Sequence, residues 1–302
     1  MDKNNILKNR KLLIVIAVIL VLSLCGYLIY SSKLSSKPDS SSNNMNSSES
    51  SSIESSESGN NTENSQPNKK DPFDGAPVIN TNIGVPVIYY HSVRPSSDNE
   101  VTITPQMLRN QLKYIKDSGY TTLTMSELND YLLNNSPIPE KSILITFDDG
   151  YMDNYNNAFP ILKDLGIKAT IFTITFELDG EYYLSKEALK EMSDYGIDIQ
   201  SHTVGHPELD TMTYEEQVAE FKESKETIES ITGKPVIAIA YPYGKYNDDS
   251  LKAVKEAGYS LGFTTDRGLA DRDDNPLKLD RIYINSEYSM DTFKDVLLNT
   301  SK

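Results

Sequence analysis

The sequence predicts an α/β fold: a distorted (β/α) barrel of about seven parallel strands, preceded by a transmembrane helix and a disordered linker. Three observations carry this prediction. Short apolar runs alternate with segments of helical periodicity from about residue 73 onward. Several of these runs end directly in polar clusters, where barrel enzymes place their sites. The alternating region of about 230 residues suits one barrel-like sheet better than two domains.

The predicted strands are apolar runs rich in Val, Ile and Phe. They are Val85–Tyr90, Ile143–Phe147, Ala169–Thr175, Ile197–Gln200, Val236–Ala240, Ser260–Thr264 and Arg281–Ile284. The predicted helices between them have apolar residues at helical spacing, and a glycine follows each of them. They are Thr104–Ser118, Asn154–Leu165, Lys186–Tyr195, Tyr214–Thr232 and Asp248–Ala257. This order predicts parallel βαβ units, because parallel neighbours need a crossover connection.

The N-terminus predicts a membrane anchor. Residues 1–11 form a basic cytoplasmic segment, and residues 12–30 are uncharged and long enough to span about 30 Å of hydrocarbon at 1.5 Å per residue. The positive flank indicates a single-pass cell-membrane protein with its C-terminal domain outside the cell. A cleaved signal peptide would instead give a secreted protein. The sequence before Cys25 loosely resembles a lipoprotein cleavage site, which would give a lipid-anchored one.

Residues 31–72 are dominated by Ser, Asn and Glu, and we expect a disordered linker that tethers the domain at 73–302. The net charge of −15 disfavours binding to nucleic acid. The single cysteine excludes an intrachain disulfide. We expect the chain to act as a monomer.

The first polar cluster follows the strand Ile143–Phe147. Adjacent carboxylates at a strand end, here Asp148 and Asp149, point in different directions, so one can ligate a metal while the other acts as a base. A simple Asp-Gly turn is the alternative. The second cluster contains two of the three histidines, His202 and His206, four residues apart. Together with Asp149 they offer a metal two imidazoles and one carboxylate and leave coordination positions open.

The run TFDDG, the downstream SHTVGH and a Pro-Tyr-Gly strand end resemble the polysaccharide deacetylase family, carbohydrate esterase family 4 with its NodB-homology domain. The resemblance covers roughly residues 80–290. It implies that Asp148 is the general base and that Asp149, His202 and His206 hold a divalent metal. Zinc is expected, with Co, Ni, Mn or Fe as alternatives. It also implies that the Tyr243 backbone N–H helps bind the oxyanion.

Two departures from the family pattern refine the resemblance. The arginine that usually lies two residues before the Pro is replaced by Ala240, and no histidine follows His206 to serve as general acid. The remaining histidine, His91, ends the first predicted strand. This resembles a rearranged branch that includes poly-N-acetylglucosamine deacetylases, in which the acid histidine precedes the Asp-Asp motif. The resemblance implies that His91 is the acid; an ordinary strand-end histidine is the alternative.

Further candidates complete the predicted site. Arg281 is a candidate to replace the missing arginine or to orient a carboxylate, and Asp266 and Asp280 are candidates to pair with a site histidine. Tyr90 and Tyr241 are candidates to stack on sugar rings.

The predicted function is metal-dependent removal of N-acetyl groups from an extracellular or cell-wall polysaccharide, either poly-N-acetylglucosamine or the glycan strands of peptidoglycan. Ester and amide hydrolysis use the same residues, so an O-acetyl esterase acting on xylan or another O-acetylated polysaccharide is an alternative. A non-catalytic carbohydrate-binding derivative of the fold is another, although it predicts damage to motifs that are intact here.

Overall fold

Seven parallel strands close into a barrel in the computed structural model, which describes residue 73 and residues 75–96 and 99–301. In spatial order they are β2 (Val87–Tyr90), β12 (Leu279–Tyr283), β11 (Leu261–Arg267), β10 (Ala238–Ala240), β9 (Asp198–Ser201), β8 (Thr170–Thr173) and β7 (Ser142–Phe147). Pairing of β2 with β7, from Val87 with Leu144 to Tyr90 with Phe147, closes the ring. The predicted parallel barrel is therefore confirmed.

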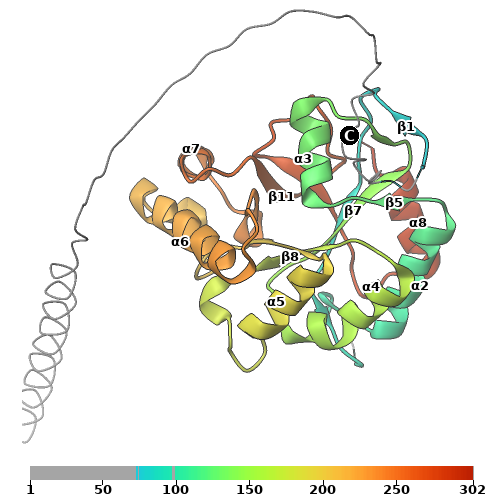
Figure 1. Ribbon diagram of the computed structural model, residues 1–302, viewed down its shortest axis with the longest axis horizontal. Helices are drawn as coiled ribbons and strands as arrows, with labels where there is room; N and C mark the ends of the chain where they lie inside the picture. Colours follow the sequence, from blue (N-terminus) through green and yellow to red (C-terminus); the bar gives the residue numbers. More distant parts are fainter. Residues whose placement is uncertain (1–72, 74, 97–98, 302) are drawn as a thin grey trace, which may run out of the picture. The chain divides into compact units, whose positions relative to one another are not determined.

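Helices surround the strands (Figure 1). They are α2 (Pro105–Asp117), α3 (Met125–Asn134), α4 (Phe159–Leu165), α5 (Lys186–Tyr195), α6 (Tyr214–Thr232), α7 (Asp248–Glu256) and α8 (Met290–Asn299). Thr104 caps α2, and Thr213 with Glu216 forms a capping box on α6, so side chains satisfy the first free N–H groups. The predicted helix at 154–165 begins instead as a π-helix, η1 (Asn154–Ala158), and continues as α4.

Several elements of the structure were not predicted from the sequence. They are helices α3 and α8, the 3₁₀ turns η2 (Thr175–Glu177), η3 (Leu209–Thr211) and η4 (Pro242–Gly244), and the short strands β1 (Val78–Ile79), β3 (Ser92–Val93), β4 (Thr102–Ile103), β5 (Thr121–Thr122) and β6 (Ile138–Pro139). Helix α3 closes the barrel interior, because Leu128 and Tyr131 are buried in one cluster with Val87 and Leu144. The sequence of α3 mixes polar and apolar residues, and no helix was predicted there.

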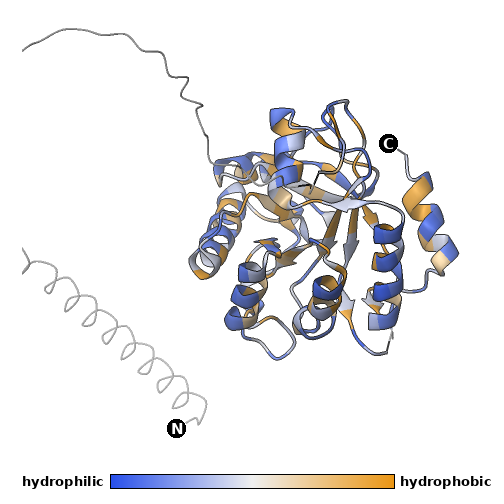
Figure 2. Ribbon diagram, turned by 45° about the vertical axis from the view of Figure 1, so that its right-hand side comes forward, coloured by the Kyte–Doolittle hydropathy of each residue, from blue (hydrophilic) through white to orange (hydrophobic). Residues whose placement is uncertain are grey.

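Strand alternation separates two cores. The side chains of Val87, Leu144 and Phe172 lie in the barrel interior, whereas their neighbours Ile88 and Ile145 pack with the surrounding helices. Successive residues of a strand point to opposite faces, so residues two apart share a face. In Figure 2 the strands are largely hydrophobic, and the helices carry hydrophilic residues on their outer sides.

The same alternation buries the rings of two residues that were predicted to stack on sugars. Tyr90 and Tyr241 belong to the outer core, with 1% and 0% of their surface exposed. The Tyr90 hydroxyl donates to Gln111 on α2, and the Tyr241 hydroxyl donates to the Leu277 carbonyl. The burial of both rings does not favour the predicted stacking on substrate, although Tyr241 is among the residues that line the cavity described below.

Among residues 75–96 and 99–301, no helix is both long and apolar enough to cross a membrane. The predicted cytoplasmic segment 1–11, membrane anchor 12–30 and linker 31–72 all lie outside the described residues.

Helix α3 provides a test of the closed barrel end. Leu128→Ala should lower the free energy of unfolding by about 2–5 kcal/mol, because it removes a fully buried side chain from the barrel interior. Urea denaturation measures this change. Leu133→Ala on the same helix is the matched control, since Leu133 is 43% exposed. Equal effects of the two substitutions would contradict the burial of α3 against the barrel.

Candidate active site

A cavity of about 390 Å³ lies at the carboxyl ends of the barrel strands. Its lining includes Tyr89, His91, Asp148, Asp149, His202, His206, Tyr243 and Tyr283. Five of the six catalytic and metal-binding residues predicted from the sequence lie just after strands. His91 follows β2, Asp148 and Asp149 follow β7, and His202 and His206 follow β9. Tyr243 lies in η4, just after β10.

Asp148 is held by a buried ion pair with Arg281. The two guanidinium NH groups donate to Asp148 Oδ1 and Oδ2, each at 2.8 Å, and the third donor, Nε, donates to the Thr264 carbonyl at 2.9 Å. The two side chains are 3% and 0% exposed. Such a two-point contact fixes the orientation of the carboxylate as well as its charge. Arg281 thus occupies the orienting position that the sequence suggested for it.

The electrostatic balance keeps Asp148 ionised. Burial alone would raise the pKa of its carboxyl, but the Arg281 guanidinium, with help from His202, outweighs burial and leaves the pKa below its ordinary value. The guanidinium carbon lies 4.1 Å from the centre of the Tyr89 ring, which stabilises the cation from one face.

Asp149, His202 and His206 form a triangle of potential metal ligands whose donor atoms all lie within 4.8 Å of one another. Asp149 Oδ1 lies 3.4 Å from His202 Nε2 and 3.6 Å from His206 Nε2. Metal–ligand bonds of about 2.0–2.1 Å place neighbouring ligand atoms about 3.3 Å apart in a tetrahedral site. The spacing therefore fits a small divalent cation.

The hydrogen bonding of His202 supports the same reading. Its Nδ1 lies 2.8 Å from the Ala240 carbonyl, which can only accept, so Nδ1 carries the proton and donates it. In the neutral ring, Nε2 then presents a lone pair toward the Asp149 carboxylate. A metal-ligating histidine commonly donates its other N–H to a backbone carbonyl in this way. Without a cation, the neighbouring carboxylates raise the pKa of His202 against the lowering effect of burial.

Unusual backbone conformations bring these ligands together. Asp149 has φ +72° and His206 has φ +55°, in the left-handed region that costs most residues energy. Gly150 follows with φ +75°, and a Cβ there would lie 2.5 Å from Thr173 Oγ1. The glycine of the Asp-Asp-Gly run is therefore required by both its conformation and its close contact.

His91 is positioned through its backbone. The Asn154 side chain donates to the His91 carbonyl at 2.8 Å, and Asp153 accepts from the Val93 N–H at 2.8 Å. The His91 Nδ1 atom is buried with no protein hydrogen-bond partner among the described residues. Burial lowers the pKa of His91, while the charges of Asp148 and Asp149 raise it by less.

The remaining predicted residues differ in outcome. Tyr243 borders the cavity, is 60% exposed and has φ +58°. Asp266 is exposed, and neither it nor Asp280 is among the residues that line this cavity. Asp280 precedes the inward-pointing Arg281, so strand alternation directs its side chain to the opposite face. Pairing of Asp266 or Asp280 with a site histidine does not fit this structure.

Tyr89 packs against the Arg281 guanidinium. Two other residues at the site were not predicted. Tyr283 lines the cavity, and Tyr151 lies close enough to Asp149 for that carboxylate to raise its hydroxyl pKa, second to burial. Spacing could have found Tyr283, since it is two residues from Arg281 and lies on the same face of the strand.

A parallel barrel whose strand ends hold a buried, oriented carboxylate beside a candidate metal site defines a barrel enzyme with the layout of a hydrolase. A sequence profile of the polysaccharide deacetylase family matches residues 135–262.

Relatives agree with that match. YxkH of Bacillus subtilis, which carries the name polysaccharide deacetylase, is 39% identical over 209 residues, covering 69% of this chain and 74% of that protein. The poly-beta-1,6-N-acetyl-D-glucosamine N-deacetylase of Staphylococcus epidermidis is 32% identical over 200 residues, covering 62% of this chain and 69% of that one. The structure of the Streptococcus pyogenes deacetylase PplD superimposes with a TM-score of 0.68 and 35% identity, covering 74% of this chain and all of that one. The chain belongs to the polysaccharide deacetylase family and is a hydrolase of that family.

The Arg281–Asp148 pair gives a pH-dependent prediction. Arg281→Met should lower the free energy of unfolding by about 3–5 kcal/mol at neutral pH, because it leaves a buried carboxylate without its partner. The pKa of Asp148 is lower in the folded protein than in the unfolded chain. The ion pair therefore contributes its full stabilisation at a pH above the ordinary Asp pKa, and this contribution is lost as the pH falls through the folded-state pKa. Without Arg281 the pKa of Asp148 should rise, so the deficit of the variant should shrink as the pH is lowered toward about 5.

Urea denaturation of both proteins across this pH range measures the effect. Arg267→Met is the control, since Arg267 contacts Thr300 near the surface rather than a carboxylate. A deficit for Arg281→Met that does not change with pH would contradict the role of the ion pair.

Proposed function

We propose that this enzyme is a metal-dependent deacetylase that removes N-acetyl groups from an extracellular or cell-wall polysaccharide. Poly-N-acetylglucosamine is the first candidate substrate, and the glycan strands of peptidoglycan are the second. The observation that carries the proposal is that His91 lines the same cavity as Asp148 and the Asp149–His202–His206 triangle. The likeness to a deacetylase of poly-beta-1,6-N-acetyl-D-glucosamine supports the choice of polymer.

In this proposal Asp149, His202 and His206 hold the cation. Two imidazoles and one carboxylate suit zinc, and they also accommodate Co, Ni, Mn or Fe. A divalent cation bound there supplies Lewis-acid chemistry, which polarises a carbonyl and makes water more acidic.

Asp148 is proposed to accept the proton of the attacking water. Each of its carboxylate oxygens receives one hydrogen bond from Arg281, and a carboxylate oxygen has a further lone pair for the water proton. Because Arg281 keeps the carboxyl ionised and fixed, the base is in the correct protonation state before substrate binds.

Tyr243 and His91 are proposed to act on the two sides of the breaking bond. The Tyr243 backbone N–H would donate to the developing oxyanion. His91 would give a proton to the departing nitrogen, since an amine leaves poorly as an anion. An alkoxide needs this help less, so a positioned acid favours N-acetyl over O-acetyl substrates.

We further propose that the enzyme acts outside the cell membrane as a monomer. Residues 1–11 would stay in the cytoplasm, residues 12–30 would anchor the chain, and residues 31–72 would tether the catalytic domain at 73–302. The apolar run and its basic flank in the sequence support this arrangement. A cleaved or lipid-anchored N-terminus would keep the domain outside as well.

The direct test is acetate release by the purified protein from β-1,6-linked N-acetylglucosamine oligomers, peptidoglycan strands and acetylxylan. We expect release from an N-acetylated polymer, loss of activity with a chelator, and recovery when zinc is added. Asp148→Asn should abolish release while zinc binding, measured by calorimetry, largely persists. Greater release from acetylxylan than from both N-acetylated polymers would overturn the proposed substrate class, and full activity of Asp148→Asn would overturn the base assignment.

His91→Ala tests the acid. We expect the rate of N-acetyl hydrolysis to fall by about 10²–10⁴-fold, the usual contribution of a positioned proton donor. Hydrolysis of p-nitrophenyl acetate should fall much less, because its phenolate leaves without a proton. Both rates can be followed by acetate and nitrophenol release. An equal loss on the two substrates would show that His91 serves structure rather than proton donation.

A further inference from the structure

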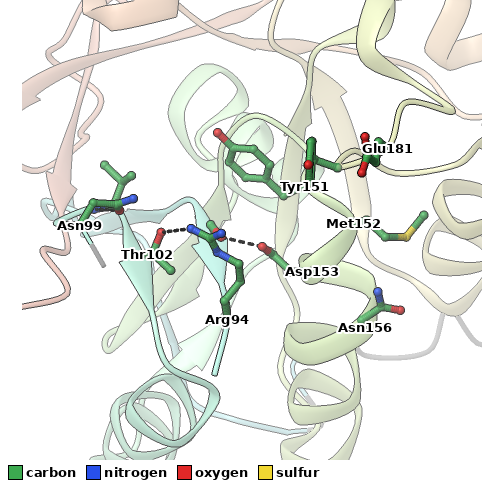
Figure 3. A pocket seen from close by; sticks show the side chains of 11 residues that line it. Arg94, Asn99, Thr102, Tyr151, Met152, Asp153, Asn156 and Glu181 are labelled. Carbon is green, nitrogen blue, oxygen red and sulfur yellow. Dashed lines mark hydrogen bonds between the residues drawn. The ribbon is translucent and has the colours of Figure 1, made fainter. Parts of the chain in front are cut away.

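The segment that carries Asp149 is held by a later part of the chain. The Leu184 N–H donates to the Gly150 carbonyl at 2.9 Å, and the Met152 N–H donates to the Tyr182 carbonyl at 2.8 Å. Figure 3 shows this segment around Met152, where it borders a pocket of about 330 Å³. The position of Asp149 is therefore fixed independently of the two histidine ligands.

The two histidine ligands depend on the short loop between them. His202 follows β9 directly, and its ring is fixed by the hydrogen bond to the Ala240 carbonyl. His206 comes four residues later, and the centre of its ring lies 4.7 Å from the centre of the His202 ring. Because His206 lies beyond the end of the strand, the loop Thr203–Gly205 determines how far apart the two imidazoles lie.

The backbone of this loop is unusual at both ends. Thr203 has φ +69° and His206 has φ +55°, and both values fall in the left-handed region that residues with a Cβ rarely adopt. Such conformations persist only where the surrounding structure holds them. The contacts of the loop should therefore account for its shape.

Two of these contacts are made within the segment itself. The Thr203 N–H donates to Ser201 Oγ at 3.1 Å, and the His206 N–H donates to Thr203 Oγ1 at 3.0 Å. On the side of η2, the carbonyls of residues 203 and 204 accept from two backbone N–H groups at 3.2 and 3.0 Å. The N–H groups of residues 204 and 205 remain, and helix α6 provides their acceptor.

That acceptor is Glu220. Its Oε2 atom accepts from the Val204 N–H at 2.8 Å and from the Gly205 N–H at 3.0 Å. Hydrogen bonds to a carboxylate are roughly twice as strong as those between neutral groups. Ser224, one turn later on the same face of α6, shares a hydrogen bond of 2.7 Å with Ser201. Helix α6 therefore holds the loop at two points.

We propose that Glu220 is a positioning residue for the metal site, which sets the separation of the His202 and His206 imidazoles by fixing the loop between them. The inference rests on the proposed function, because it takes these two histidines as ligands of a cation. Glu220 is not among the residues that line the active-site cavity, so it acts through the backbone of the loop.

Substitutions of Glu220 separate position from charge. Glu220→Gln keeps an oxygen at the same reach and removes the charge, whereas Glu220→Asp keeps the charge and shortens the side chain. Glu220→Asp and Glu220→Ala should weaken zinc binding by about 10–100-fold, the usual effect of losing a group that orients a ligand. Glu220→Gln should retain most of the affinity. Calorimetric titration of zinc into the purified, metal-free protein measures these affinities.

Glu223→Ala is the matched control, since Glu223 is exposed on the same helix. Its zinc affinity should equal that of the wild type. Weak binding by Glu220→Gln together with normal binding by Glu220→Asp would show that only the charge matters, and would overturn the proposal. Wild-type affinity in Glu220→Ala, or an equal loss in Glu223→Ala, would overturn it as well.

Exchange of backbone amide hydrogens tests the same contact without a metal. In the metal-free protein, the Val204 and Gly205 amides should exchange about tenfold faster in Glu220→Asp and Glu220→Ala, because each amide loses a hydrogen bond to a charged group. In Glu220→Gln they should exchange nearly as slowly as in the wild type. Nuclear magnetic resonance resolves the two amides.

The two measurements distinguish this inference from the proposed function. Unchanged amide exchange in Glu220→Asp and Glu220→Ala would refute the role of Glu220 whether or not zinc binds. Altered exchange in a protein whose wild type binds no zinc would instead refute the proposed metal ligation, while the fixed spacing of the two imidazoles would stand.

Discussion

The buried ion pair between Arg281 and Asp148 is the constraint around which this site is arranged. It joins β12 to the end of β7 across the barrel interior, where neither charge could be left alone without a cost of several kcal/mol. Its geometry requires space for a large cation within the barrel. The small side chains of Ala238 and Ala240, which lie in the same interior, are consistent with that space, and Tyr89 covers one face of the guanidinium.

The pair also links the two halves of the proposed chemistry. Arg281 keeps Asp148 ionised and oriented, and the next residue, Asp149, turns into a left-handed conformation that directs its carboxylate toward His202 and His206. The two adjacent carboxylates thus point toward different partners, because the backbone is left-handed at Asp149. The Ala240 carbonyl accepts the Nδ1 hydrogen of His202 and so fixes the orientation of that ring.

The backbone around His91 is held by the start of η1. The Asp153 carboxylate accepts from the Val93 N–H, and the Asn154 side chain donates to the His91 carbonyl. Placement of the proposed acid therefore depends on these two hydrogen bonds.

The sequence by itself determined the parallel barrel, the family and the order of the polar motifs, because apolar strands alternating with helices and short motifs at strand ends are local features. It also placed Asp148, Asp149, His202, His206 and His91 among the candidates that the structure brings to one cavity. It did not determine which face each strand residue occupies. The rings of Tyr90 and Tyr241 are buried in the outer core while Tyr89 packs against Arg281 in the barrel, and a shift of one residue reverses this outcome.

The sequence offered Arg281 as a candidate to orient a carboxylate, but only the tertiary structure decided that it pairs with Asp148, 133 positions away in the chain. Only the tertiary structure likewise decided the burial of α3 against the barrel end. Contacts between distant residues depend on barrel closure and strand register, and neither is encoded in any single stretch of sequence.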